Sequence, residues 1–217
     1  MAKKSAKEQI KKLALAGIIA ALCYVGYAVF PAISVTGTKV HLGNAFVILG
    51  ALLLGPLYGG LAGAVGLSLA DILGGYAQSS PRTFICKLLI GVIVGLIAHK
   101  IGKINKKQPW NKIVLWTVVG TVTAMIFNCV FEPTLKYVWY TLLTPDADKA
   151  ASAIKSLMAI TTTATIINAV INSITGIAFY LALRPILIKS GIIVLDEVRD
   201  TDKDVEEGKN SKASKSD

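Results

Sequence analysis

Apolar runs separated by short polar breaks occupy most of the chain, and the longest run organises the rest. No Asp, Glu, Lys or Arg occurs from Leu42 to Ala70, a run of 29 residues. One helix of that length would be roughly 43 Å long at about 1.5 Å per residue, too long for a hydrocarbon core of ~30 Å. Gly55-Pro56 lies in its middle, and proline lacks a backbone donor and disfavours helix in the preceding residue. The pattern therefore predicts a tight helical hairpin over residues 42–54 and 57–73.

Four further apolar stretches approach or exceed the length that spans a bilayer. They cover about residues 13–30, 83–98, 113–131 and 156–183, and Pro133 and Pro185 are expected to end the last two. Together with the hairpin they predict an all-α integral membrane protein of six transmembrane helices, in one membrane domain over residues 13–188. Residues 1–12 are predicted to be a basic cytoplasmic leader. Residues 189–217, rich in lysines and acids, are predicted to be a disordered cytoplasmic tail.

Composition and charge agree with a membrane location. The 217 residues are 53% hydrophobic, and a mean hydropathy of +0.60 is too high for a soluble domain of this size. The net charge of +10 gathers in two places, with five lysines before the first span and five more between residues 100 and 112. This is the positive-inside pattern, so both termini are predicted to be cytoplasmic in a multi-pass protein of the cell membrane. The charge does not indicate nucleic-acid binding.

Two polar stripes on the last two predicted helices are expected to face the inside of the bundle, because lipid-facing polar residues are costly. On the last helix the spacing of the polar residues places them on one face: Thr161, Thr165, Asn168, Asn172 and Thr175. The helix before it has a similar stripe: Thr117, Thr121, Asn128 and Glu132. Such residues bind a solute or only hydrogen-bond the helices together, and the sequence leaves both interpretations open.

Four charged residues are expected to meet at the outer ends of three helices, where they would form a ligand site with their neighbours. Two are acids, Asp71 and Glu132, and two are bases, Arg82 and Lys87, so a nearly neutral ligand is expected. Interfacial snorkelling is the alternative for the bases. Tyr76 is a candidate stacking surface, or part of an interfacial aromatic belt. The complete predicted substrate-binding set is Asn44, Asp71, Tyr76, Lys87, Asn128, Glu132, Asn168 and Asn172.

Motifs for catalysis are missing from the sequence. There is no GxxxxGK[ST] phosphate loop, no HExxH and no nucleophile elbow. The chain is therefore predicted to be neither an enzyme nor an ATPase, with no catalytic residue, metal site or cofactor of its own.

Four stretches of the first half of the chain form a distinctive set: HLGNA at 41–45, GPLYGGLAG at 55–63, LADILGGY at 69–76 and PRTF at 81–84, followed by Lys87. They resemble the substrate-binding S components of energy-coupling factor (ECF) transporters, above all the branch for riboflavin, hydroxymethylpyrimidine and pyridoxine. The resemblance implies a six-helix S-component bundle that binds a vitamin near the outer face, with residues 31–42 as its gate. It also implies docking through Ala16 and Ala20 onto a transmembrane coupling subunit carried by two ATPase subunits, which hydrolyse the ATP.

The resulting hypothesis is a high-affinity vitamin-binding subunit for a pyridoxine-like compound or hydroxymethylpyrimidine, with riboflavin or another vitamin as the alternative. Two other functions remain open. One is a secondary carrier that moves a proton through Asp71 or Glu132. The other is a membrane scaffold that binds no solute, in which the polar stripes only join helices.

Overall fold

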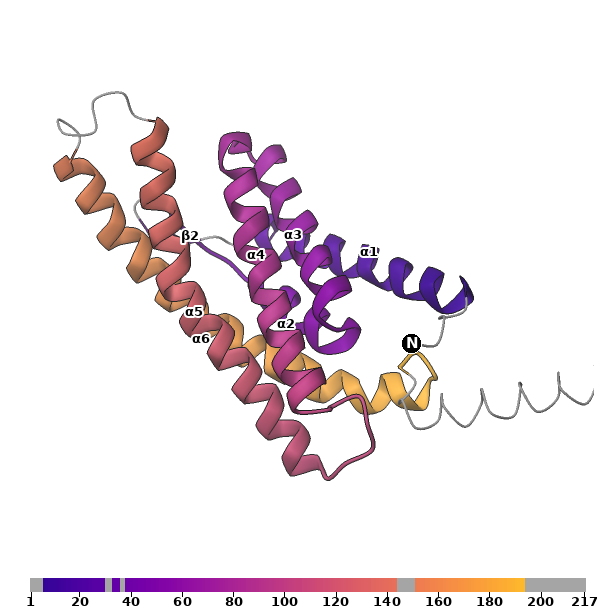
Figure 1. Cartoon of the computed structure of the whole chain (residues 1–217). Coiled ribbons are helices and arrows are strands. Elements are labelled where there is room, and N and C mark those ends of the chain that lie inside the picture. Colours follow the sequence, from indigo (N-terminus) through magenta and orange to yellow (C-terminus); the bar gives the residue numbers. More distant parts are fainter. Residues whose placement is uncertain (1–5, 30–32, 36–37, 144–150, 194–217) are drawn as a thin grey trace, which may run out of the picture.

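The computed structural model describes residues 6–29, 33–35, 38–143 and 151–193, and within them six α-helices form one bundle (Figure 1). The helices are α1 (Ala6–Ala28), α2 (Gly43–Leu54), α3 (Pro56–Leu73), α4 (Ser80–Gly95), α5 (Trp110–Leu143) and α6 (Ala151–Lys189). A 3₁₀ turn, η1 (Ala77–Ser79), precedes α4, and a π-helical segment, η2 (Leu96–Ile101), follows it. Five helical segments are long and apolar enough to cross a membrane, whereas α2 has only 12 residues. The predicted helical membrane fold is confirmed, with one helix too short to span.

The turn between α2 and α3 lies where the sequence predicts it. Gly55 has a φ of +86°, a left-handed conformation that glycine adopts without strain. Pro56 has no N–H to donate to the Leu52 carbonyl four residues earlier, and His99 compensates. Its Nε2 lies 3.0 Å from the Leu52 oxygen and 3.2 Å from the Ala51 oxygen, and donates to them because a carbonyl only accepts. The η2 segment thus caps the short helix α2.

Close backbone contact holds α2, α3 and α4 together. A Cβ atom on Gly91 would lie 2.4 Å from the Cα of Gly60, and one on Gly59 would lie 2.4 Å from the Cα of Ala51. Only glycine permits such an approach, as in other membrane helix pairs. The core is built around α2, whose Ile48 side chain is completely buried.

The predicted ends of the last two spans are wrong, because α5 continues through Pro133 and α6 continues through Pro185. An interior proline removes one hydrogen bond of a helix, and membrane helices tolerate this loss when their neighbours support them. Glu132 therefore lies inside α5, with Lys136 one turn further along the same face. At the other end of the chain, α1 begins at Ala6, so the described part of the predicted leader is helical.

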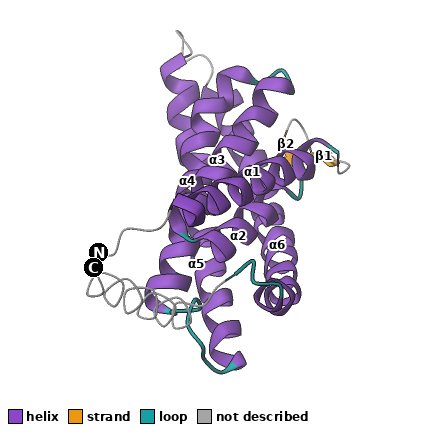
Figure 2. Cartoon of the chain, turned by 90° about the vertical axis from the view of Figure 1, so that its right-hand side faces the viewer, coloured by secondary structure: helices purple, strands orange, loops and turns teal. Residues whose placement is uncertain are grey.

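The connection between α1 and α2 contains a small antiparallel hairpin of β1 (Ile33–Val35) and β2 (Thr38–Val40). Ile33 pairs with Val40, and Val35 pairs with Thr38. The hairpin lies at the periphery of the bundle (Figure 2), with β2 in contact with α6. This contact brings the connection between α1 and α2 against the last helix.

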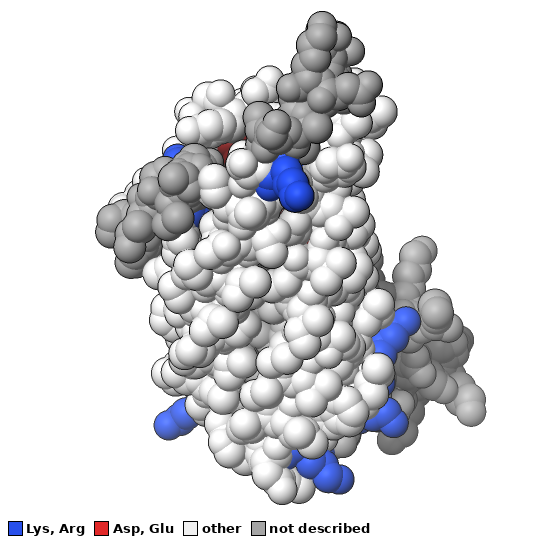
Figure 3. Space-filling view, turned by 90° about the vertical axis from the view of Figure 1, so that its left-hand side faces the viewer, with Lys and Arg blue, Asp and Glu red and all other residues white. Residues whose placement is uncertain are grey.

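The exterior has the charge distribution of a membrane protein. On the face drawn in Figure 3, the described Lys and Arg side chains gather at the two ends, and a wide band between them is free of charge. Lys11 donates a 2.7 Å hydrogen bond to the carbonyl of Gly191, so the start of α1 and the end of α6 lie at the same end. The connection between α3 and α4 lies at the opposite end (Figure 1). Of the predicted tail, residues 189–217, the structure describes only the first five positions, 189–193.

Candidate functional site

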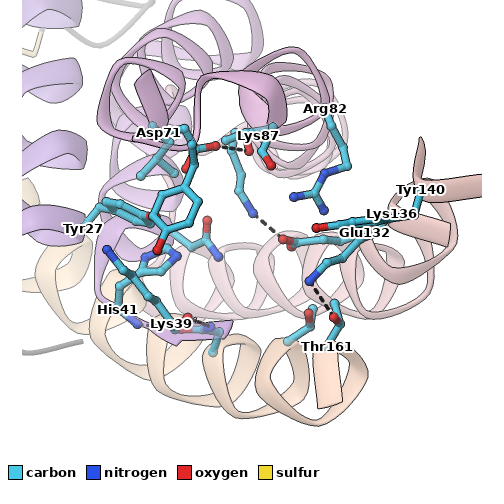
Figure 4. A pocket seen from close by; sticks show the side chains of 17 residues that line it. Tyr27, Lys39, His41, Asp71, Arg82, Lys87, Glu132, Lys136, Tyr140 and Thr161 are labelled. Atoms are coloured by element: carbon cyan, nitrogen blue, oxygen red, sulfur yellow. Dashed lines mark hydrogen bonds and ion pairs between the residues drawn. The ribbon is translucent and has the colours of Figure 1, made fainter. Parts of the chain in front are cut away.

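A cavity of about 190 Å³ opens at the end of the bundle that carries the α3–α4 connection, and its walls are mostly polar. All six helices contribute to it, as do strand β2 and the turn η1 (Figure 4). Six of the eight predicted substrate-binding residues line it: Asn44, Asp71, Tyr76, Lys87, Glu132 and Asn168. The other two, Asn128 and Asn172, do not. Residues as far apart as 27 and 168 therefore share one cavity.

An ion pair between α4 and α5 spans one wall. The Nζ of Lys87 lies 3.0 Å from Oε2 of Glu132, and Lys87 is 4% exposed. Asn128 is one turn before Glu132 and donates from Nδ2 to the same oxygen at 3.1 Å. This hydrogen bond fixes the position of the Glu132 carboxylate, although Asn128 itself does not line the cavity. Its own Oδ1 is buried without a hydrogen-bond partner among the described residues.

The two asparagines of α6 bind the backbone of the segment that joins β2 to α2. Asn168 accepts at Oδ1 from the N–H of His41 at 2.9 Å and donates from Nδ2 to the Lys39 carbonyl at 3.0 Å. Asn172 accepts from the N–H of Ala45 at 2.8 Å and donates to the His41 carbonyl at 2.9 Å. Both amides therefore fix the position of this segment, and Asn168 also lines the cavity.

One end of the cavity is aromatic. The Nζ of Lys39 lies 5.0 Å from the ring centroid of Tyr27 and 5.4 Å from that of Tyr76, within cation–π range. Asp71 is 7% exposed and accepts a hydrogen bond from the hydroxyl of Thr83. Sequence reasoning did not name Tyr27 or Lys39, because it assigned no binding residue to α1 and treated residues 31–42 only as a gate.

His41 lies beside this aromatic end and is neutral at physiological pH. Its Nδ1 accepts from the N–H of Gly43 at 3.1 Å, and its ring packs edge-on against Tyr27 with a centroid separation of 4.8 Å. Burial, followed by the charges of Lys87 and Lys39, lowers the pKa of His41 to about 3. A neutral imidazole can keep Nδ1 free of a proton, which the hydrogen bond from Gly43 requires.

The opposite end of the cavity is cationic. Lys136 is 8% exposed, and its Nζ donates to the hydroxyl of Thr161 at 2.7 Å. Arg82 approaches the same region from α4 (Figure 4). The expected balance of two acids and two bases is therefore wrong, because the lining contains four bases, Lys39, Arg82, Lys87 and Lys136, and two acids, Asp71 and Glu132. The proline at position 133 concealed Lys136, since the predicted helix ended there.

The two predicted docking alanines face the chain's own helices. Ala16 is 9% exposed and belongs to the core. Ala20 is partly buried, and its carbonyl would lie 2.3 Å from a Cβ placed on Gly66 of α3. Small residues that are exposed on α1 occur in another register, at Gly17 and Ala21. Metal binding has no support in the described residues, where no three His, Cys, Asp or Glu side chains come together.

The bundle and its polar cavity define a class of protein, a helical membrane protein with a binding site for a small solute at one end. Residues 7–185 match the family described as the ECF-type riboflavin transporter, S component. The chain belongs to this family, which consists of transporter components that work with an ECF module. Membership confirms the predicted resemblance to S components and the prediction that the chain is not an enzyme.

Two further similarities concern the fold and part of the sequence. The fold resembles the 2.1 Å crystal structure of the S-component for biotin from an ECF-type ABC transporter, with a TM-score of 0.58 and 17% identity over 85% of this chain and 94% of that one. An uncharacterized protein in a gap 3′ region of Pyrococcus woesei is 37% identical over 87 residues, 40% of this chain. That match spans about half, 54%, of the relative's length.

Proposed function

We propose that this chain is the vitamin-binding subunit of an ATP-driven ECF uptake transporter in the cell membrane. It captures a small, flat, polar heterocycle of the pyridoxine or hydroxymethylpyrimidine type at the outer face, and the coupling module delivers that ligand inward. The single observation that carries the proposal is the polar cavity, which lies at the end opposite to the start of α1 and the end of α6. The lysines before the first span and those of residues 100–112 support a cytoplasmic location for the end that carries the start of α1 and the end of α6.

The size of the cavity favours a ligand with a single ring. Its volume is about 190 Å³, below the ~300–1,000 Å³ typical of pockets for drug-sized ligands. The rings of Tyr27 and Tyr76 supply aromatic surface at one end, and Asp71 supplies an acceptor beside them. A one-ring heterocycle with several hydroxyl groups matches this combination of flat and polar surfaces.

Riboflavin is the second candidate, and the family description is the observation that favours it. Its three fused rings need more space than this cavity offers, so the hairpin β1–β2 or the ends of α5 and α6 would have to move apart. Binding of riboflavin thus predicts an expanded site, whereas binding of a one-ring vitamin does not.

The test is a titration of the purified protein in detergent with a panel of water-soluble vitamins, read by tryptophan fluorescence and by thermal unfolding. We expect one compound to raise the unfolding temperature at submicromolar concentration, because a ligand that binds only the folded state stabilises it by mass action. Stabilisation by riboflavin alone would select the second candidate. If a folded protein responds to no vitamin of the panel, the proposed function is wrong.

The partners follow from the same proposal. A transmembrane coupling subunit and two ATPase subunits would use an exposed face of α1, and the residues available there are Gly17 and Ala21 rather than the buried Ala16. Nothing in this chain binds a cofactor under this proposal, since ATP is hydrolysed by the partner subunits.

A further inference from the structure

The lining of the cavity contains more bases than acids, and this excess of positive charge bears on the charge of the substrate proposed above. Among the described lining residues, four bases face two acids. His41 adds no charge, because its pKa lies at about 3. An excess of two positive charges around a small, partly buried cavity is costly unless a counter-charge is present, since burial weakens the screening by water.

The excess positive charge is not spread evenly. Lys39 lies over the rings of Tyr27 and Tyr76, which stabilise a cation at the aromatic end. Lys87 pairs with Glu132 at 3.0 Å. The two remaining bases, Arg82 and Lys136, both lie at the far end, on opposite sides of the Glu132 carboxylate (Figure 4).

The far end therefore has two cations without an ion pair among the described residues. Lys136 is 8% exposed. Among the described residues, its Nζ donates a hydrogen bond only to a neutral group, the hydroxyl of Thr161. The Nε–H of Arg82 is buried and meets no acceptor among the described residues. Buried donors without acceptors are rare in folded proteins and need a specific explanation.

We propose that Arg82 and Lys136 form an anion subsite, which binds a carboxylate or phosphate group of the substrate while its ring lies toward Tyr27 and Tyr76. The guanidinium of Arg82 offers two parallel donors to such a group, and Lys136 offers a point charge. The inference rests on the proposed function and narrows it, because the substrate then becomes an anionic derivative of a one-ring vitamin. The carboxylate of Glu132, whose charge is balanced by its ion pair with Lys87, lies beside this subsite.

Three compounds with the same ring test the subsite in the purified full-length chain. Pyridoxine is uncharged in its side chains, 4-pyridoxic acid has a carboxylate, and pyridoxine 5′-phosphate has a phosphate. Riboflavin and its 5′-phosphate form a second pair for the alternative ring. We expect an anionic member to bind at least about tenfold more tightly than its neutral counterpart, and the better of carboxylate and phosphate identifies the anion.

Variants assign the effect to the two residues. Arg82→Gln and Lys136→Met should each remove the preference for the anionic compound, while affinity for the neutral one falls less than about threefold. Lys155→Met is the matched control, because Lys155 is an exposed lysine near the start of α6 and does not line the cavity. Anion preference should survive in it.

The possible failures are distinguishable. Equal or tighter binding of the neutral member in the unmodified protein overturns the anion subsite and leaves the proposed function intact. Anion preference that persists in both Arg82→Gln and Lys136→Met also overturns the assignment. Binding of no compound from either series overturns the subsite, and the proposed function falls with it only if no vitamin of the full panel binds.

Discussion

The effects of Lys87 and Glu132 on the free energy of unfolding should be coupled, and a double-mutant cycle measures this coupling energy. Two unit charges 3.0 Å apart attract by about 5.5 kcal/mol at an effective dielectric constant of ~20. Desolvation of both groups offsets much of this attraction, and removing one partner of a buried pair typically costs about 3–5 kcal/mol. Because the pair borders a cavity that water can enter, we expect about 2–3 kcal/mol for Lys87→Met, near the lower end of that range.

The two single variants should not be equivalent. Lys87→Met leaves the Glu132 carboxylate near Arg82 and Lys136, which still supply positive charge. Glu132→Gln leaves three cations around one neutral amide, so it should cost about 1 kcal/mol more. The double variant Lys87→Met/Glu132→Gln should be more stable than the sum of the single effects predicts, by about 1–3 kcal/mol.

Thermal unfolding in detergent measures all four proteins of the cycle. A destabilisation of 1 kcal/mol lowers the unfolding temperature by about 2–4 °C in a chain of this size, so a loss of about 2–4 kcal/mol should lower it by about 4–16 °C in the single variants. A coupling energy below about 0.5 kcal/mol would show that the two charges act independently. Equal losses from both single variants would refute the reasoning about the neighbouring cations.

Three further predictions test other parts of the structure. Gly17→Trp and Ala21→Trp, on the exposed face of α1, should abolish vitamin uptake by cells with the complete transporter while ligand binding to the purified chain persists; loss of binding as well would exclude a docking role for this face. The neutral His41 takes up a proton on unfolding below about pH 6.5. The free energy of unfolding should therefore fall as the pH is lowered from 6.5 toward 3, by up to about 1.4 kcal/mol per pH unit. Chemical denaturation over this pH range should show a weaker pH dependence in His41→Gln. Gly91→Val should cost about 3 kcal/mol or more in thermal unfolding, because its Cβ would meet backbone that cannot yield, whereas Gly17→Ala, with open space around it, should change stability by less than about 0.5 kcal/mol.

The sequence determines the helical hairpin well because its signals are local. A charge-free run longer than a bilayer together with Gly55-Pro56 permits little else, and the turn lies at that dipeptide. The same rule about proline failed at Pro133, since the loss of one hydrogen bond is small beside the packing of a long helix against its neighbours. That error also hid Lys136, and with it the true charge of the cavity. Local signals thus predict turns better than they predict where a packed helix ends.

The site itself depends on contacts that no local pattern contains. The spacing of Asn168 and Asn172 correctly indicates an inward face of α6, yet it cannot show whether the amides meet a solute or the backbone. That choice depends on β2, a strand of three residues that the apolar pattern does not reveal. Polar stripes therefore identify the face of a membrane helix, and the occupant of that face requires the three-dimensional structure.

The contacts of Asn168 link the binding site to the β-hairpin formed by β1 and β2. Asn168 lines the cavity and also donates to the Lys39 carbonyl, while the Lys39 side chain reaches over the aromatic end of the same cavity. A ligand that contacts Lys39 adds interactions that exist only while β2 lies against α6. By linkage, binding must then favour the arrangement in which β2 lies against α6, and loss of the hydrogen bonds of Asn168 must weaken binding even where its amide does not touch the ligand. The same amide thus contributes to the stability of this segment and to the affinity of the site.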